Sequence, residues 1–316
     1  MSTKLRIMWL TAVPLALFAV FALGCSPAAD NGGGGDDTVS DGTTDDDGPM
    51  SDDGAGGDAD SAPAATDDGA PSGAAVEWAT LKGRFVYDGE APTPAKIDVT
   101  KDVDFCGKHM LVNEELLVNS ENGGIKNVIV FLDVRRGDDQ PPIAPSYEES
   151  AAAEVLLDNK NCRFEPHICL LRTTQSFIIG NDDPVGHNTK IDCFDNQSIN
   201  PSVPANSKED AYKNHFTAEE NLPANVSCSI HPWMSARLVV RENPYMAVSD
   251  ENGDFEIKDL PAGKWTMQVY QEKSGFVDSV NVGGKDENWN KGRVEIDTSK
   301  GDIDWGDVKV KPVVFE

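Results

Sequence analysis

The residues best suited to chemistry in this chain stand close together in one short segment. Cys228, His231 and Met234 form a Cys-x2-His-x2-Met pattern, and His187 lies 41 residues before the cysteine. One thiolate, two imidazoles and a weak thioether are the ligands of a copper site that transfers single electrons, because thiolate holds Cu(I) and imidazole suits both oxidation states. We therefore predict one copper site with these four ligands. The alternative is that Cys228 forms a disulfide and His231 lies in a turn.

The segments around these residues have the patterns of strands. One expected strand ends at Val226-Ser227-Cys228, and the next begins with the apolar run 236–240. Another, 176–179, leads into a polar loop that delivers His187. Residues 151–242 contain no sustained helical period. Three of the predicted ligands thus connect two adjacent strands, and the fourth arrives from elsewhere in the same sandwich.

Strand patterns also flank this region on both sides. Residues 77–150 predict an N-terminal β-rich region that ends in a Pro-rich, charged connector. Residues 245–316 alternate apolar and polar positions between glycine-containing turns. We expect an all-β chain, with a Greek-key sandwich at 151–242 and a smaller β-sandwich at 245–316.

The N-terminus has the pattern of an export signal. Lys4 and Arg6 precede an apolar run that ends at Gly24, and Cys25 follows directly. This arrangement predicts a signal peptide over residues 1–25, with lipidation at Cys25. An uncleaved signal anchor is the alternative, because the apolar run approaches the length of a membrane span.

Residues 26–76 have the composition of a disordered tether. They contain 13 Asp and no Glu, Lys, Arg or aromatic residue. Such a segment cannot bury enough apolar surface to offset the entropy of ordering. Weak calcium binding is the alternative, but no loop with the spacing of a calcium-binding hand occurs there.

The folded part of the chain is acidic. The whole chain carries −27, and residues 77–316 carry −16 of this charge. Phosphate would be repelled, which argues against nucleic acid as a partner. A basic redox protein would instead be attracted over long distances. The alternative, which we favour, is an acidic surface that only keeps the chain soluble.

The chain has six cysteines. If one is lipidated and one binds metal, four remain as disulfide candidates, namely Cys106, Cys162, Cys169 and Cys193. Four cysteines allow three pairings, and an exported protein keeps such bonds. We favour Cys106–Cys162 together with Cys169–Cys193.

The remaining histidines exclude several classes of enzyme. His109, His167 and His215 form no His-x-His pair, which a multicopper oxidase or nitrite reductase would need. We expect these three at the surface or in packing roles, with His167 the strongest rival ligand. A binuclear copper centre needs a second cysteine in the Cys228 loop, and none occurs. The Gly-x-Ser-x-Gly motif of serine hydrolases and the Gly-rich phosphate loop are also missing. We therefore expect no enzymatic activity.

The order of these motifs resembles the cupredoxin family, the blue type 1 copper proteins. The resemblance rests on Gly180-Asn181-Asp182, on His187-Asn188 and on the segment Cys228–Met234, whose short loop is similar to that of amicyanins. The same loop is similar to exported proteins labelled as methylamine utilisation proteins. The segment 249–270 resembles carboxypeptidase regulatory-like, or transthyretin-like, sandwich domains.

This resemblance implies roles for individual residues. His187, His231 and Cys228 would be the equatorial ligands, and Met234 would be the axial thioether. Asn188 would tie the first histidine loop to Ser229, the residue after the cysteine, and thereby support the ligand geometry. The stretch between His187 and Cys228 is longer than in amicyanin, which leaves the exposure of the site open.

Together these patterns predict an exported, lipid-anchored electron carrier. It would face the periplasm or the cell surface and meet its redox partners transiently. One alternative is a copper storage or delivery lipoprotein that exchanges metal readily. Another is a structural or adhesive surface protein with a vestigial metal site.

Overall fold

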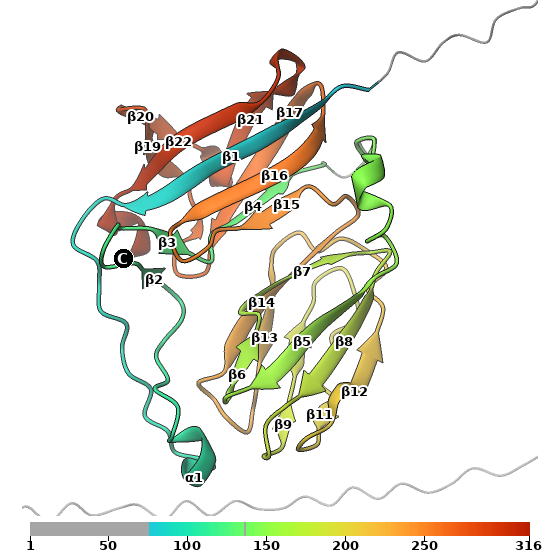
Figure 1. Cartoon of the computed structure of the whole chain (residues 1–316), viewed down its shortest axis with the longest axis vertical. Coiled ribbons are helices and arrows are strands. Elements are labelled where there is room, and N and C mark those ends of the chain that lie inside the picture. The colour runs from blue at the N-terminus through green and yellow to red at the C-terminus, as the bar shows by residue number, and fades with distance from the viewer. Residues whose placement is uncertain (1–75, 136) are drawn as a thin grey trace, which may run out of the picture. The chain divides into compact units, whose positions relative to one another are not determined.

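A computed structural model describes residues 76–135 and 137–316 (Figure 1). Its regular secondary structure is almost entirely β-strand, which confirms the predicted all-β class. The signal peptide, Cys25 and nearly all of the tether lie outside the described residues. No helix in the described part is long and apolar enough to cross a membrane.

Two sets of strands form two sandwiches. The first, here the terminal sandwich, is built by β1 (Trp78–Tyr87), β4 (Ile129–Leu132), β15 (Met246–Val248), β16 (Asp254–Pro261), β17 (Lys264–Gln271), β18 (Gly275–Phe276), β19 (Ser279–Val282), β20 (Lys285–Asn288), β21 (Arg293–Asp297) and β22 (Ile303–Val310). One sheet has the order β16-β1-β22-β19-β20 and the other β15-β4-β17-β18, with β21 paired to β17.

The second set, here the central sandwich, comes from the middle of the chain. Its strands are β5 (Glu154–Lys160), β6 (Arg163–Glu165), β7 (Ile168–Arg172), β8 (Ser176–Asn181), β9 (His187–Asn188), β10 (Lys190–Asp192), β11 (Ser202–Val203), β12 (Lys208–Asn214), β13 (Ala224–Ser227) and β14 (Ser235–Arg241). They form sheets of order β10-β13-β14-β7 and β12-β8-β5-β6, and β9 pairs with β11.

Short elements complete the described chain. They are the ribbon strands β2 (Leu117–Val118) and β3 (Ile125–Lys126), the helix α1 (Val103–Cys106), and the 3-10 turns η1 (Pro145–Tyr147), η2 (Asn290–Gly292), η3 (Thr298–Lys300) and η4 (Pro312–Phe315). The helix α1 lies on a long connection between β1 and β2.

The N-terminal strands are integral to the terminal sandwich. Figure 1 shows β1 between β16 and β22, and β4 lies between β15 and β17. The backbones of Gly124 and Asn252 are so close that no side chain fits between them. A Cβ atom on Gly124 would lie 2.1 Å from the carbonyl oxygen of Asn252. The ranges 77–150 and 245–316, which we expected as separate regions, thus contribute strands to the same two sheets.

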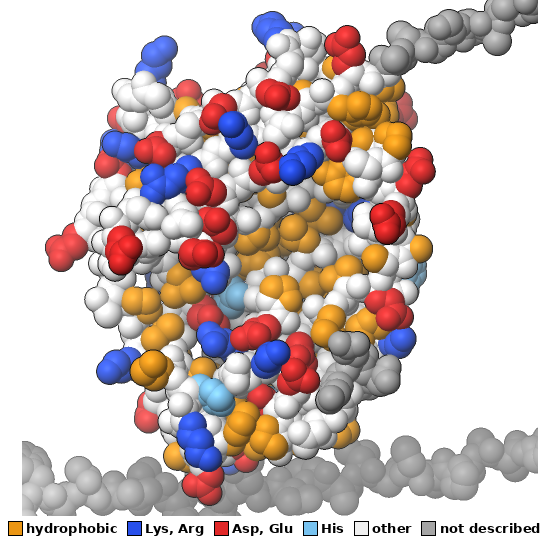
Figure 2. Space-filling view, in the orientation of Figure 1, with side chains coloured by type: hydrophobic (Ala, Val, Ile, Leu, Met, Phe, Trp, Pro, Cys, Tyr) orange, Lys and Arg blue, Asp and Glu red, His pale blue; other side chains and the backbone are white. Residues whose placement is uncertain are grey.

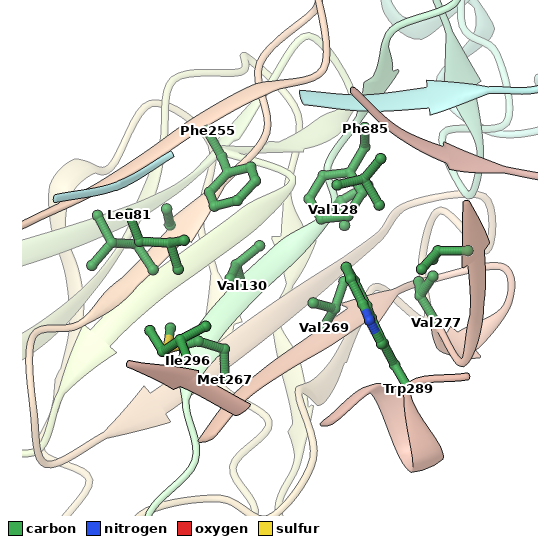
Figure 3. Packing of buried hydrophobic residues seen from close by; sticks show 14 of the residues in the cluster. Leu81, Phe85, Val128, Val130, Phe255, Met267, Val269, Val277, Trp289 and Ile296 are labelled. Atoms are coloured by element: carbon green, nitrogen blue, oxygen red, sulfur yellow. The ribbon is translucent and has the colours of Figure 1, made fainter. Parts of the chain in front are cut away.

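The apolar run in β4 is explained by its two buried faces. Val130 and Leu132 point into the core of the terminal sandwich, where Figure 3 shows Val130 among Phe85, Phe255 and Val269. Ile129 and Phe131 point the other way and pack against Ile168 and Val239 of the central sandwich. A strand with both faces buried lacks the usual apolar–polar alternation.

Charges of both signs cover the surface seen in Figure 2. Lys and Arg side chains are interspersed there with Asp and Glu, and no basic patch dominates this face.

Candidate metal centre

The loop Cys228–Met234 connects two neighbouring antiparallel strands, as expected. Ser227 at the end of β13 pairs with Ser235 at the start of β14. Inside the loop, the Met234 N–H donates to the His231 carbonyl at 2.9 Å, and the Cys228 N–H donates to the Met234 carbonyl at 3.3 Å. These bonds close the loop and turn Cys228 and His231 to the same side.

His187 arrives from the short strand β9. It pairs with Val203 of β11, and this backbone pairing fixes the position of His187 at the edge of the sandwich. The preceding loop is held by the buried Asn181, whose side-chain amide donates to the carbonyls of Val185 and Pro204, each at 2.9 Å. His187 is therefore well anchored, although a long stretch of chain separates it from Cys228.

The three strongest ligand candidates converge. The Nδ1 atoms of His187 and His231 are 2.9 Å apart, and the Cys228 Sγ lies 3.8 Å from the His231 Nδ1. All three residues are buried, with exposures of 1, 0 and 2 % for His187, His231 and Cys228. Within the described residues, no other group of three His, Cys, Asp or Glu side chains offers ligand atoms this close together.

Met234, the predicted axial ligand, lies in the same loop. It is 1 % exposed and packs in the core of the central sandwich with Cys228. Its role as the fourth ligand stays a prediction.

The surroundings of Cys228 favour the thiolate form of its side chain. Burial opposes ionisation of Cys228, but hydrogen bonds from His187, His231 and nearby backbone groups outweigh it and lower the pKa to about 5. At His187, burial favours the neutral ring, yet the hydrogen bonds to Asp183 and Cys228 win and raise its pKa. In the metal-free protein both shifts favour the charged forms of these side chains, and thiolate is the form that binds metal.

Asn188 connects the two ligand loops. Its Oδ1 accepts the Ser229 N–H at 2.7 Å and the Ile230 N–H at 3.3 Å, and lies 3.5 Å from the Cys228 Sγ. Its Nδ2 lies 3.5 Å from the Ser229 Oγ and donates to Asn200 at 2.7 Å. The structure thus brings Asn188 and Ser229 together, chiefly through the backbone N–H of Ser229 rather than through its hydroxyl.

Sequence reasoning missed two carboxylates at the site. The Nε2 of His187 lies 2.9 Å from Asp183 Oδ2, and the Nε2 of His231 lies 2.8 Å from Asp102 Oδ2. Asp183 stands four residues before His187, a spacing that could have signalled it. Asp102 stands 129 residues before His231, in the α1 connection, and no local pattern announces it.

One predicted disulfide forms and the other does not. Cys106 and Cys162 are bonded, whereas Cys169 and Cys193 are free. The second pairing was wrong because β7 and β10 lie at opposite edges of one sheet, with β14 and β13 between them. Three strand spacings amount to about 14 Å, and a disulfide spans Cα atoms no more than about 7 Å apart.

The other histidines lie apart from this cluster. The His167 Nε2 is 2.5 Å from Glu272, a buried contact between the two sandwiches. His109 packs edge-on against Phe105, and His215 contacts the carbonyl of Gln175. His109 and His167 thus have packing roles, and His215 is exposed, as expected for a surface residue.

Comparisons with known proteins return cupredoxins of low similarity. No protein-family model and no curated protein sequence matches the chain. Among solved structures, a purple cupredoxin from Nitrosopumilus maritimus is 21 % identical, covers 28 % of this chain and 98 % of its own, and has a TM-score of 0.23.

Two further structures show the same pattern. A single-residue mutant of amicyanin in its Cu(I) form is 18 % identical and covers 35 % of this chain and 98 % of its own, with a TM-score of 0.24. A copper-containing nitrite reductase from Thermus scotoductus SA-01 is 16 % identical and covers 35 % of this chain and 25 % of its own, with a TM-score of 0.25. Because these scores are low, the functional argument rests on the geometry of the cluster alone.

Proposed function

We propose that this chain holds one type 1 copper ion and carries single electrons between redox partners. The observation that carries the proposal is the buried approach of one cysteine sulfur and two imidazole Nδ1 atoms to within 4.8 Å of one another. Bound copper would supply a one-electron couple between Cu(II) and Cu(I).

The donor atoms fit a single ion of this type. Separations of 2.9 and 3.8 Å between donors suit one ion with bonds of about 2.0–2.3 Å to nitrogen and sulfur. The mixture of soft thiolate and imidazole favours copper over hard cations, which prefer oxygen. His187, Cys228 and His231 would hold the ion, and the buried Met234 would supply the weak fourth contact.

The burial of the site supports electron transfer over catalysis. A catalytic metal site keeps a position open to substrate. Here the three donor residues are at most 2 % exposed, and Asn188 and Asp183 hold them in place through hydrogen bonds. An electron can leave such a site through the protein, whereas a substrate would need an open position beside the metal.

Export and lipid anchoring at Cys25 belong to the same proposal. The Cys106–Cys162 disulfide supports an oxidising compartment, such as a periplasm or cell surface. A tether of acidic residues would let the folded part reach partners away from the membrane. The charge of −16 on residues 77–316 favours basic, transiently bound redox proteins.

The test is the visible spectrum of residues 77–316 after addition of Cu(II). We expect an intense thiolate-to-copper absorption band that disappears on reduction and returns on oxidation. The variant Cys228→Ser should be colourless, and Cys193→Ser, which changes a free cysteine outside the cluster, should keep the band. A colourless wild-type protein would refute the proposal. A band that bleaches irreversibly, with fast loss of metal to a chelator, would favour storage or delivery.

A further inference from the structure

We propose that Asp102 is a positioning residue of the metal centre, which orients His231 from outside the central sandwich. The inference rests on the proposed function only for the consequence to copper, because the contact itself belongs to the metal-free protein. Asp102 lies in the long connection between β1 and β2, and no feature of the ligand motif points to it.

The contact determines which nitrogen of His231 can face the metal. A carboxylate accepts hydrogen bonds only, so Asp102 Oδ2 at 2.8 Å places the ring proton of neutral His231 on Nε2. When a metal is bound, the lone pair of the neutral ring would lie on Nδ1, the atom that faces His187 and Cys228. Asp183 has the same relation to the Nε2 of His187. Hydrogen bonds of this kind fix the orientation and increase the basicity of metal-binding imidazoles.

The backbone directs the Asp102 carboxylate toward this contact. Asp102 stands at the N-terminal cap of α1 with φ 45° and ψ 42°, a left-handed conformation that Asp tolerates better than most residues. An aspartate at this position usually accepts a hydrogen bond from its own helix. The Asp102 side chain caps nothing in α1, and its carboxylate contacts His231 instead.

A disulfide holds this segment over the site. Cys106, four residues after Asp102, is bonded to Cys162 of the central sandwich. The Cys162 N–H donates to Asp183 at 2.8 Å, and its carbonyl accepts from the Trp233 indole at 3.1 Å. The Trp233 ring in turn lies 5.2 Å from the His231 ring. Cys162 therefore connects the α1 segment to the supports of both imidazoles.

The exposed fractions distinguish the two partners. The His231 side chain is 0 % exposed, whereas that of Asp102 is 42 % exposed. Asp102 therefore lies between the imidazole and solvent on this side, and removal of its side chain would open the Nε2 edge to water. Exchange of the His231 Nε2–H proton with water therefore reports directly on the Asp102 contact.

The experiment detects the imidazole N–H protons of metal-free protein labelled with ¹⁵N-histidine. Wild type and Asp104→Ala, a control at an exposed acidic residue of the same helix, should show a protected Nε2–H signal for His231. Asp102→Ala should lose that signal to exchange with water. The Nε2–H of His187, bonded to Asp183, should persist in all variants and report that the fold is intact. Asp102→Asn should retain the His231 signal at a shifted position, because its amide oxygen still accepts.

The copper-loaded proteins provide the second measurement. We expect Asp102→Ala to weaken Cu(I) binding about 10- to 100-fold in chelator competition, with a smaller loss in Asp102→Asn and none in Asp104→Ala. An unchanged His231 signal in Asp102→Ala, or its absence from the wild type, would overturn the inference. So would a Cu(I) affinity for Asp102→Ala within twofold of Asp104→Ala. If the wild type binds no copper but Asp102→Ala still loses the signal, the proposed function fails and the positioning contact stands.

Discussion

At Cys228, burial and hydrogen bonding act on the thiol in opposite directions. Burial raises the cost of the thiolate, but the two imidazoles and the backbone N–H groups stabilise it more, so the pKa falls to about 5. Cys169, equally buried but without such partners, has its pKa raised to about 12 by burial alone. The two cysteines differ in chemistry because only one of them faces donors.

The first prediction concerns this thiolate. In metal-free protein, the ultraviolet absorbance of thiolate should titrate with a midpoint near pH 5, because the hydrogen-bonded form persists at neutral pH. In His187→Ala the midpoint should rise toward the value of a free thiol, since one partner is lost. The control Cys169→Ser should leave the midpoint unchanged. A wild-type midpoint at or above pH 8 would contradict the assigned hydrogen bonds.

The same shifts determine how these residues affect stability. The folded pKa of Cys228 lies below its unfolded value of 9.0, so its contribution is complete above pH 9 and is lost as the pH falls through about 5. The raised pKa of His187 acts in the opposite sense. Its contribution is complete below its unfolded value of 6.5 and is lost as the pH rises through the folded pKa.

At the scale of elements, the α1 segment depends on its disulfide. The helix has only four residues, too few to be stable by itself. A small cluster of Cys106, Leu111 and Cys162 with Phe105 and Trp233 packs beneath it. The covalent bond confines this segment next to the candidate metal centre, whose proposed ligands all come from the central sandwich.

Removal of the disulfide should lower the stability of the whole fold. The bond closes a loop with a sequence separation of 56 residues, and loops of this size stabilise by about 2–4 kcal/mol. We expect the double variant Cys106→Ser/Cys162→Ser to lose this free energy of unfolding in urea titrations. It should also lose the protected His231 N–H signal.

The matched control is Cys193→Ser, which removes a partly exposed free thiol. Its free energy of unfolding should stay within about 0.5 kcal/mol of wild type, as for most surface substitutions. If the double variant matched this control, the bond would have no part in holding the α1 segment in place.

At the scale of the molecule, strands from both ends of the described chain build one sandwich, and the middle of the chain builds the other. The parallel pair β1–β22 joins strands from opposite ends of this part of the chain, with Leu81 opposite Ile303. The middle of the chain, which contains the ligand cluster, is thus an insertion between strands of a single sheet system. Asp102 lies in the connection between β1 and β2, and His231 lies in the loop between β13 and β14. Their hydrogen bond therefore joins the two sandwiches.

This topology predicts that the C-terminal region does not fold by itself. A fragment of residues 245–316 lacks β1 and β4, which lie between its own strands in both sheets. It should show no cooperative thermal transition by circular dichroism, whereas residues 77–316 should unfold cooperatively. A cooperative transition in the isolated fragment would mean that the N-terminal strands are dispensable.

The sequence by itself determined the strand character of the chain and the candidates His187, Cys228, His231 and Met234. These features are local: strand patterns repeat over a few residues, and a short loop between adjacent strands brings its ends together in any sandwich. The contact between Asn188 and the residue after Cys228 was expected only from the resemblance to cupredoxins, because it joins segments 41 residues apart in the sequence.

Only the tertiary structure decided which distant segments meet. The order of strands in a sheet depends on how whole faces pack, so the sequence could not reveal that β7 and β10 stand too far apart for Cys169 to reach Cys193. Nor could it reveal that β1 inserts between β16 and β22. The support of His231 by Asp102 is of the same kind, because a single hydrogen bond between connections of two sandwiches leaves no periodic trace along the chain.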